Sequence, residues 1–330
     1  MTEGRDEFDL IGALAARFGT GGGLAPGDLG IGDDAAVVTL PGPGRVVLAT
    51  DLVVEGVHVD PAVSSPEDVG WKALMVTVSD LAAMGCAPSH VLLSVAAPAG
   101  YAVERLGAGV ALAAEAAGCA VVGGDLSSST LLVVSVAAVG PAADHVVPVL
   151  SRAGARPGDH LFVTGPLGGS AAGLRRTRGG GTDGGGPADG GAADIGAAAR
   201  VPPAGTSAHR RPVARILEGV AARGAGASAC IDVSDGLAAD VTHLAEASAV
   251  GLDLEVPDPV VVEGATRDEA LYGGEDYELV VATPDPDALL AAFTRAGLRA
   301  PLAIGRCTDR TAGRRLDGAP LETGGWRHRF

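Results

Sequence analysis

The sequence predicts a two-domain α/β (α+β) protein. Its 330 residues exceed the usual length of one domain, and apolar stretches of strand length alternate with longer stretches of helical spacing. Hydrophobic residues make up 47% of the chain and charged residues 19%, which excludes a globally disordered chain. Only 3% of the residues are aromatic, so we expect cores of Val, Leu, Ile and Ala.

The elements of the first half follow from apolar spacing and from the residues that bound each stretch. We expect a helix at 8–18 and a long helix at 66–84, with Ser65 as its N-cap, Pro66 at its first position and Gly85 as its C-terminal stop. The other elements expected here are strands at 46–54, 90–98, 119–125 and 131–140 and an alanine-rich helix at 101–118. The strand at 119–125 is expected to be buried and to run into a glycine turn.

A change of composition near residues 145–158 predicts the domain boundary, which divides the chain into 1–148 and 149–330. Within the second domain, Gly, Ala and Pro dominate the segment 178–208, which predicts a flexible surface insertion because it cannot bury enough apolar surface. The remaining expected elements are a strand within 151–165, a helix at 212–223, a strand at 229–233, a helix at 236–250, strands near 252–256 and at 273–282, and a C-terminal α/β tail.

Charge and cysteine usage limit the classes of partner and compartment. The net charge of −16 argues against nucleic acid and against an anionic membrane as partners, whereas a nucleotide stays compatible because bound metal inverts the local charge. The four cysteines are far apart and lack zinc-site spacing, so we interpret them as free thiols in a reducing cytosol. The acidic first ten residues do not resemble a signal peptide, and no apolar run reaches the ~20 residues of a membrane span. We therefore expect a cytoplasmic protein.

Acidic residues at the ends of apolar stretches are the main functional signal. They are Asp33, Asp34, Asp51, Asp80, Asp125, Asp232, Asp235, Glu275 and Asp276. Buried carboxylates are costly unless they are paired, and the one lysine, Lys72, and the arginines, most of which lie elsewhere in the sequence, do not supply enough partners. Mg²⁺ prefers carboxylate oxygens and usually bridges to substrate phosphates. These clusters therefore predict a multi-metal site for a highly charged phosphate substrate.

Each acidic motif also has a plain structural interpretation. Gly32-Asp33-Asp34, Gly123-Gly124-Asp125 and Gly273-Gly274-Glu275-Asp276 fit ordinary turns. Asp51, expected just past a strand, could be a capping residue of that strand. Asp80 lies inside an apolar helical run, where it could form an ion pair with an arginine. Ser234 or Asp235 could be the N-cap of the following helix. The exposed N–H groups at the start of that helix could also bind an anion. Only the joint order of the motifs is specific.

That joint order resembles the thiamine-monophosphate kinases, which share a superfamily with aminoimidazole ribonucleotide synthetase, selenophosphate synthetase and a hydrogenase-maturation enzyme. The matching segments run from about residue 8 to the end of the chain. They include GIGDDAAVV, ATDLVVEGVH, GWKALMVTVSDLAAMGCAP, VVGGDLSSS, HRRPVARI, IDVSDGLAADVTHL, GGEDYEL and GGWRHRF. The segments SDLAAMG, IDVSDGL and GGEDYEL together single out the thiamine-phosphate branch.

The resemblance implies an N-terminal domain whose strands form a barrel across a homodimer interface, a C-terminal α/β domain, and ATP with several Mg²⁺ ions between the two. A monovalent cation is a further candidate. The implied metal ligands are Asp34, Thr50, Asp51, Asp80, Asp125, Asp232 and Asp235, of which Asp51, Asp80 and Asp232 are the implied catalytic residues. The implied nucleotide contacts are Gly124, Asp125, Arg152 and Ser234, and the implied contacts of thiamine phosphate are His58, Glu275 and Trp326.

The implied reaction is direct transfer of the ATP γ-phosphoryl group to thiamine monophosphate, which gives thiamine diphosphate and ADP. The acceptor phosphate is largely ionised at neutral pH because its second pKa is ~6, so no strong general base is needed. The expected obstacle is repulsion between the two substrates, on the order of 4 kcal/mol per close like-charge pair at an effective dielectric of ~20. Bound cations remove that repulsion.

Three other interpretations stay open at this point. One is another ATP-using member of the superfamily, similar to aminoimidazole ribonucleotide synthetase or to selenophosphate synthetase. The latter normally carries a reactive cysteine near its N-terminus, whereas the first cysteine here is Cys86. A second is a non-catalytic nucleotide- or metal-binding protein, from which we would expect some acidic clusters to be missing. The third is an acidic structural protein whose aspartates cap turns, and it leaves the ordered set of motifs unexplained.

Overall fold

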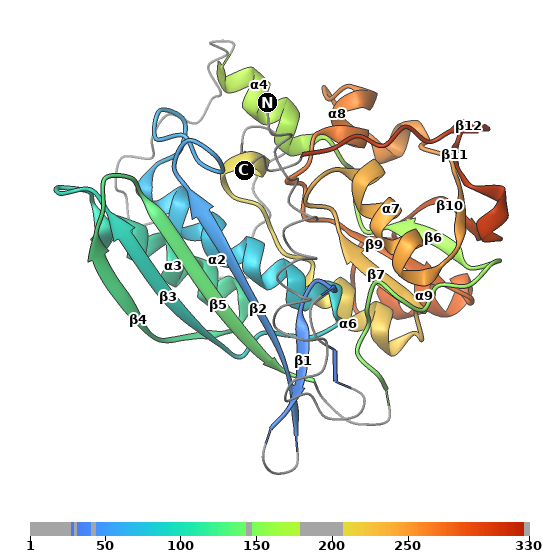
Figure 1. The fold of residues 1–330 in the computed structure, drawn as a ribbon, viewed down its shortest axis with the longest axis horizontal. Helices are drawn as coiled ribbons and strands as arrows, with labels where there is room; N and C mark the ends of the chain where they lie inside the picture. Colours follow the sequence, from blue (N-terminus) through green and yellow to red (C-terminus); the bar gives the residue numbers. More distant parts are fainter. Residues whose placement is uncertain (1–27, 30–31, 41–43, 143–146, 179–206, 327–330) are drawn as a thin grey trace, which may run out of the picture.

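The computed structural model describes residues 28–29, 32–40, 44–142, 147–178 and 207–326. Each half of the chain builds one mixed β-sheet with helices packed on it, so the predicted two-domain α/β architecture is confirmed (Figure 1). The helix predicted at 8–18 and nearly all of the insertion predicted at 178–208 lie outside the described residues. Among the described residues, no helix has the length and apolar character needed to cross a membrane.

The N-terminal sheet has the strand order β1-β2-β5-β3-β4. Its strands are β1 (Ala36–Thr39), β2 (Arg45–Val54), β3 (His90–Ala97), β4 (Ala120–Ser128) and β5 (Val133–Pro141). All neighbouring strands are antiparallel except β3 and β4, which are parallel. Within one chain this sheet is open, and β1 and β4 form its edges.

Two helices, α2 (Pro66–Ala83) and α3 (Val103–Ala117), lie against one face of this sheet (Figure 1). The predicted start of α2 is confirmed, because the Ser65 hydroxyl accepts from the backbone N–H of Asp68 and the Asp68 carboxylate accepts from that of Ser65. The two helices approach closely at glycines, since a Cβ added to Gly109 would lie 2.0 Å from a backbone oxygen of α2. α3 therefore packs closely against the first turns of α2, the helix that carries Asp80 near its other end.

The C-terminal sheet has the order β12-β11-β8-β10-β6-β9-β7. Its strands are β6 (His160–Val163), β7 (Ala229–Asp232), β8 (Gly251–Leu254), β9 (Leu279–Thr283), β10 (Leu302–Thr308), β11 (Arg314–Leu316) and β12 (Ala319–Pro320). The accompanying α-helices are α4 (Gly169–Arg178), α5 (Ser207–Arg210), α6 (Ile216–Gly224), α7 (Leu237–Ser248), α8 (Arg267–Tyr272) and α9 (Pro286–Arg295), with short 3₁₀ turns at Asp258–Val260 and Arg310–Ala312.

The C-terminal sheet has an apolar core on each face. One core joins the sheet to α7 and α8, and the other joins it to α6 and α9. The second core also contains Ala82 and Ala83 from the end of α2, so this N-terminal helix packs directly on the C-terminal domain. Gly219 of α6 makes the contact close, because a Cβ there would lie 2.0 Å from the carbonyl oxygen of Ala82. The domains therefore meet along α2.

Four element predictions were wrong in detail. β4 was expected to be buried and to end in a turn at Gly123-Gly124, but it continues to Ser128 and is exposed along its length because it is the outermost strand. The Thr50-Asp51 pair lies inside β2 rather than just past it, since the strand pairs with β5 as far as Val54. The strand expected at 273–282 begins only at Leu279, after an irregular loop. The helix expected at 212–223 begins at Ile216.

Candidate active site

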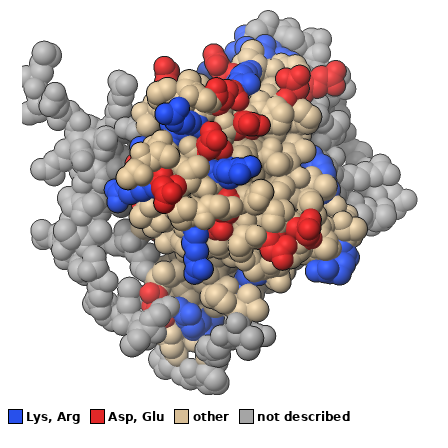
Figure 2. Space-filling view, turned by 90° about the vertical axis from the view of Figure 1, so that its right-hand side faces the viewer, with Lys and Arg blue, Asp and Glu red and all other residues tan. Residues whose placement is uncertain are grey.

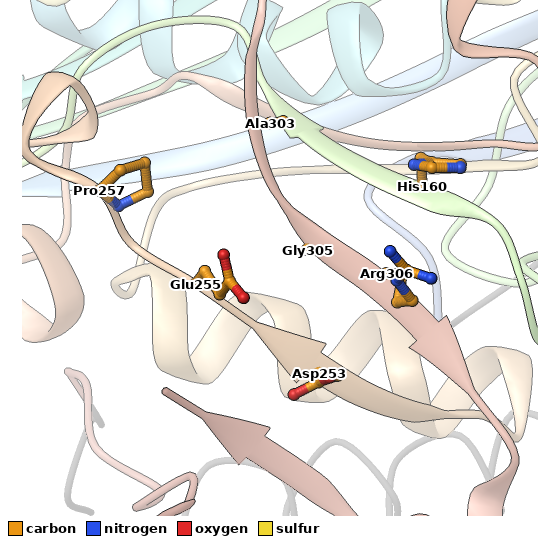
Figure 3. A pocket seen from close by; sticks show the side chains of 7 residues that line it. All are labelled: His160, Asp253, Glu255, Pro257, Ala303, Gly305 and Arg306. Carbon is orange, nitrogen blue, oxygen red and sulfur yellow. The ribbon is translucent and has the colours of Figure 1, made fainter. Parts of the chain in front are cut away.

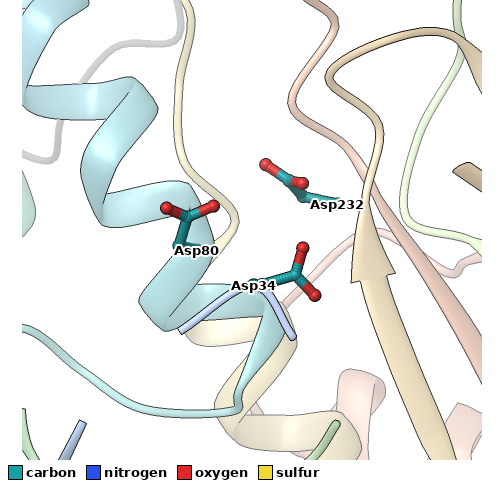
Figure 4. Close-up of side chains that lie close together, drawn as sticks. All are labelled: Asp34, Asp80 and Asp232. Atoms are coloured by element: carbon teal, nitrogen blue, oxygen red, sulfur yellow. The ribbon is translucent and has the colours of Figure 1, made fainter. Parts of the chain in front are cut away.

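Three of the predicted metal ligands meet where α2 crosses the end of the C-terminal sheet. Asp34 precedes β1, Asp80 lies on α2 and Asp232 ends β7 (Figure 4). One carboxylate oxygen from each residue lies within 4.8 Å of the others. Residues almost 200 positions apart in the sequence thus form one cluster, because the end of α2 packs against the second domain.

Asp51 belongs to the same group, because the side chains of Asp80 and Thr77 lie close enough to influence its pKa. Burial is the largest cause that raises the pKa of each of these aspartates. For Asp80 the neighbouring carboxylates add to burial and place the pKa well above its usual value. For Asp232, burial together with Asp34 raises the pKa to about 8. Four carboxylates this close resist ionising together, which makes them suited to a multivalent cation.

One arginine partly balances this charge. Arg152 Nη2 lies 2.8 Å from Asp34 Oδ1, and the backbone N–H of Arg152 donates to Asp33 at 3.1 Å. Burial opposes the charge of Arg152, but the surrounding aspartates outweigh it and raise the pKa of the guanidinium. Arg152, one of the predicted nucleotide contacts, therefore lies directly beside the aspartate cluster. A surplus of carboxylate remains, and the buried Oδ2 of Asp34 has no hydrogen-bond partner among the described residues.

Two hydroxyl side chains that were not predicted also lie at the cluster. Ser79 Oγ donates to Asp232 Oδ2 at 2.6 Å, whereas Thr77 lies beside Asp51 and donates to the carbonyl oxygen of Ala73 at 3.0 Å. Both are fully buried on α2. The available signal was the alternation of polar with apolar residues in VTVSD, which places two hydroxyls one and three positions before Asp80.

Other predicted nucleotide or metal residues lie outside the three-aspartate cluster. The Thr50 hydroxyl donates to the carbonyl oxygen of Val136 at 3.0 Å, so its proton is used within the sheet. Asp125 is exposed on β4, where Ser127 Oγ lies 3.4 Å from it. Gly124 has a structural reason to be glycine, because a Cβ there would lie 1.7 Å from the carbonyl oxygen of Leu93.

Ser234 and Asp235 occupy the turn between β7 and α7. This turn is held by Asp240, whose carboxylate accepts from the backbone N–H groups of Asp235 at 3.2 Å and Gly236 at 3.1 Å. The backbone N–H of Trp326 donates to the carbonyl oxygen of Asp235 at 3.0 Å, and the Trp326 side chain is 54% exposed. A small hollow beside them is also lined by His243. The structure thus brings Trp326 to the turn that carries Asp235.

A second polar group unites two of the three predicted substrate residues. Lys72 Nζ lies 2.6 Å from Glu275 Oε1 and donates to the carbonyl oxygen of His58 at 2.8 Å. On its other side, Glu275 Oε2 lies 3.1 Å from Nδ1 of His209. Burial would raise the pKa of Glu275, but Lys72 and His209 outweigh it and lower that pKa to about 2. The His58 imidazole is oriented by the backbone N–H of Val54, which donates to Nδ1 at 3.1 Å.

A separate hollow lies away from both groups. It has a volume of about 360 Å³ on the face of β6, β8 and β10, and His160, Asp253, Glu255 and Arg306 line it (Figure 3). None of the predicted site residues lies in it. On the face of the molecule shown in Figure 2, acidic and basic side chains are interspersed, so the net negative charge is not gathered there.

Comparisons with known proteins find relatives over most of the chain. The family described as AIR synthase related protein matches with its N-terminal domain at residues 32–142 and with its C-terminal domain at 156–317. The thiamine-monophosphate kinase of Bacillus subtilis (strain 168) is 32% identical over 317 residues, which cover 93% of this chain and 92% of that protein. That of Mycobacterium tuberculosis (strain H37Rv) is 37% identical and covers 88% and 80%. A solved structure of AaThiL complexed with AMPPCP and TMP has a TM-score of 0.76 at 32% identity, covering 98% and 97%.

Proposed function

The chain belongs to the thiamine-monophosphate kinase family, and we propose that it transfers the γ-phosphoryl group of ATP in line and directly to its acceptor, using several Mg²⁺ ions. The reaction is the ATP-dependent phosphorylation of thiamine monophosphate to thiamine diphosphate. The observation that carries the mechanism is the cluster of buried aspartates where the two domains meet. We set aside the activities of the related cyclase and of selenophosphate synthetase, because the relatives that show the family of this chain are thiamine-monophosphate kinases.

The residues of the cluster fit a hard divalent cation. They offer only carboxylate oxygens, the pKa of each is raised, and one buried oxygen of Asp34 is without a hydrogen-bond partner among the described residues. The proposed ligands are Asp34, Thr50, Asp51, Asp80, Asp125, Asp232 and Asp235, with Asp51, Asp80 and Asp232 as the catalytic residues. When bound, Mg²⁺ would neutralise the phosphates of both substrates and so reduce the repulsion between them.

The chain's own residues bind and orient the substrates in this proposal. Arg152 is held by Asp34 and offers its remaining donors to the phosphates of ATP. Gly124, Asp125 and Ser234 complete the proposed nucleotide contacts. A general base is not required, since the acceptor phosphate has a second pKa of ~6 and is largely ionised at neutral pH.

His58, Glu275 and Trp326 are the proposed contacts of thiamine monophosphate. His58 and Glu275 share the contact with Lys72, and Trp326, which is 54% exposed, would lie against the cationic ring of thiamine. The first two residues come from different domains. A substrate held by them would therefore lie across the domain junction, beside the aspartates.

We further propose that the chain is a homodimer in which two N-terminal sheets form a barrel. Large apolar side chains are exposed on this sheet, which is costly in water. They include Leu48, Leu52, Leu92, Val121, Val122 and Leu126. The outermost strand β4 also presents an unpaired edge within one chain. A second copy would cover both features.

The domain boundary proposed at 148/149 is supported by the gap between the two matched family regions, which end at 142 and begin at 156. A location in the cytoplasm, where the four cysteines remain thiols, is likewise a proposal.

The stereochemical course of transfer tests the proposed mechanism. ATP made chiral at the γ-phosphorus with three oxygen isotopes is converted, and the configuration of the terminal phosphoryl group of thiamine diphosphate is read by phosphorus NMR. Direct in-line transfer predicts inversion. Retention would mean two successive transfers through a phosphorylated enzyme and would overturn the proposal.

A further inference from the structure

A buried network surrounds Glu275 and continues beyond the residues that the resemblance assigns. Lys72 contacts one oxygen of the Glu275 carboxylate at 2.6 Å, and His209 Nδ1 contacts the other at 3.1 Å. Ser170 Oγ lies 3.0 Å from the same nitrogen of His209. Lys72, His209 and Ser170 are all buried, whereas the Glu275 side chain keeps 27% of its surface exposed. The network therefore has one accessible member.

The backbone at Glu275 is in an unusual conformation that needs outside support. Glu275 has φ = 57° and Tyr277 has φ = 52°, both in the left-handed region that residues other than glycine seldom adopt. Such backbone conformations cost free energy and occur often at functional sites. Here the carboxylate is held from two sides, by Lys72 of α2 in the N-terminal domain and by His209 of α5 in the C-terminal domain.

The geometry leaves part of the carboxylate free for a ligand. An ionised carboxylate has about four lone-pair positions, of which Lys72 and His209 use one on each oxygen. The remaining positions are fixed in direction because both oxygens are held. A carboxylate of this kind recognises a hydrogen-bond donor, and thiamine offers one in the amino group of its pyrimidine ring.

We propose that Lys72 and His209 are positioning residues that orient the Glu275 carboxylate toward the amino group of the thiamine pyrimidine. This inference rests on the proposed function, because it assigns specificity to the same site. His209 donates from Nδ1 to Glu275, since two acceptor atoms at 3.1 Å would repel each other. Ser170 Oγ lies 3.0 Å from the same N–H and shares it as a second acceptor, so both neighbours fix the orientation of the imidazole. Neither Lys72 nor His209 needs to touch the substrate.

The test compares two substitutions of His209. His209→Ala removes the donor, whereas His209→Asn retains an N–H near the position of Nδ1. The same pair of substitutions at His160, which is exposed at the start of β6 and lines the separate hollow, is the matched control. For each variant, KM is measured separately for thiamine monophosphate and for ATP.

Loss of a hydrogen bond to a charged group predicts that His209→Ala raises KM for thiamine monophosphate by about 10-fold or more. KM for ATP should stay within about two-fold of wild type, and His209→Asn should recover most of the loss. Lys72→Met should repeat the effect of His209→Ala; should it fail to fold, the two His209 variants decide alone. Two results would overturn the inference. One is the same KM for thiamine monophosphate in His209→Ala and His209→Asn, and the other is a parallel rise of KM for thiamine monophosphate and KM for ATP.

A second readout uses oxythiamine monophosphate, which lacks the pyrimidine amino group. The wild type should prefer thiamine monophosphate, and His209→Ala should lose most of that preference, measured as the ratio of the two kcat/KM values. An unchanged ratio would overturn the assignment to the amino group. A wild-type enzyme that does not convert thiamine monophosphate at all would instead contradict the proposed function, so the two failures are distinguishable.

Discussion

The hydroxyl of Ser79 donates a hydrogen bond of 2.6 Å to the carboxylate of Asp232, and this bond joins the two domains inside the aspartate cluster. Both side chains are buried. Burial and Asp34 raise the pKa of Asp232 to about 8, and the hydrogen bond from Ser79 opposes that rise. Ser79 thereby favours the ionised form of Asp232 that a cation requires.

Replacing Ser79 with alanine should therefore shift the pH dependence of the enzyme. Without the hydroxyl the pKa of Asp232 rises further, so a larger share of the carboxylate is protonated at pH 7. We expect kcat/KM for ATP to fall about 10-fold at pH 7 and to recover toward wild type at pH 9. Thr294→Ala, on the exposed side of α9, is the control. An unchanged profile would show that Ser79 does not act on Asp232.

Replacing Asp80 with asparagine should separate stability from activity. Its pKa is raised well above the unfolded value by burial and by neighbouring carboxylates, so above about pH 4 its ionisation opposes folding in the absence of metal. The neutral variant should then melt about 2–4 °C higher without metal, for a gain of about 1 kcal/mol.

Scanning fluorimetry with chelator and with excess Mg²⁺ checks this prediction. Mg²⁺ should raise the melting temperature of the wild type and of the control Asp253→Asn, but not of Asp80→Asn. Turnover of Asp80→Asn should fall by at least about 100-fold. A variant that is less stable without metal and still stabilised by Mg²⁺ would remove Asp80 from the metal site.

Binding of Mg²⁺ to the substrate-free protein should release protons at pH 7. The pKa of about 8 at Asp232 and the raised pKa of Asp80 mean that the metal-free cluster holds protons at this pH, and a cation displaces them. Calorimetry in two buffers with different ionisation enthalpies measures the number released. That number should decrease from pH 7 to pH 9, and a value of zero at pH 7 would show that Mg²⁺ does not bind at the protonated aspartates.

Arg223 should be important for stability rather than for chemistry. Its guanidinium is buried and donates to the carbonyl oxygens of Ala142 at 2.7 Å, Val147 at 2.5 Å and Pro148 at 3.0 Å, which flank the connection between the domains. Arg223→Met leaves these acceptors without their donor, so the free energy of unfolding should fall by about 3 kcal/mol or more. Urea unfolding measures this free energy for Arg223→Met and for the control Arg295→Met on α9. A decrease for Arg223→Met as small as that for the control would refute the stabilising role of Arg223.

A charge on the exposed face of the N-terminal sheet should disrupt the proposed homodimer. Leu126 on β4 is 69% exposed within one chain, and Asp in its place would be buried without a partner in a dimer. Light scattering should give a dimer for the wild type and a monomer for Leu126→Asp. Leu290→Asp, an equivalent change at an exposed leucine of α9, should stay dimeric. A monomeric wild type would contradict the proposal.

Local signals predicted the elements that local interactions specify. The cap at Ser65 and the apolar run that follows placed α2 and put Asp80 on a helix, as observed. Tertiary position was not predictable in the same way. The apolar sequence of β4 resembles that of a buried strand, yet the strand is exposed because the sheet ends there.

The same distinction applies to the site. The acidic motifs could be found by residue type, but the sequence does not indicate that Arg152 pairs with Asp34 or that Lys72 reaches Glu275. Those contacts depend on how α2 packs against the second domain. His209 begins the segment HRRPVARI, which was part of the resemblance without a role for His209, and only the folded chain brings it to Glu275.

The most direct experiment mixes the protein with ATP, Mg²⁺ and thiamine monophosphate and resolves the products by phosphorus NMR or chromatography. We expect equimolar thiamine diphosphate and ADP from the wild type, and neither product from Asp80→Asn or when Mg²⁺ is chelated. Unchanged thiamine monophosphate with intact ATP in the wild-type reaction, or full turnover by Asp80→Asn, would contradict this expectation.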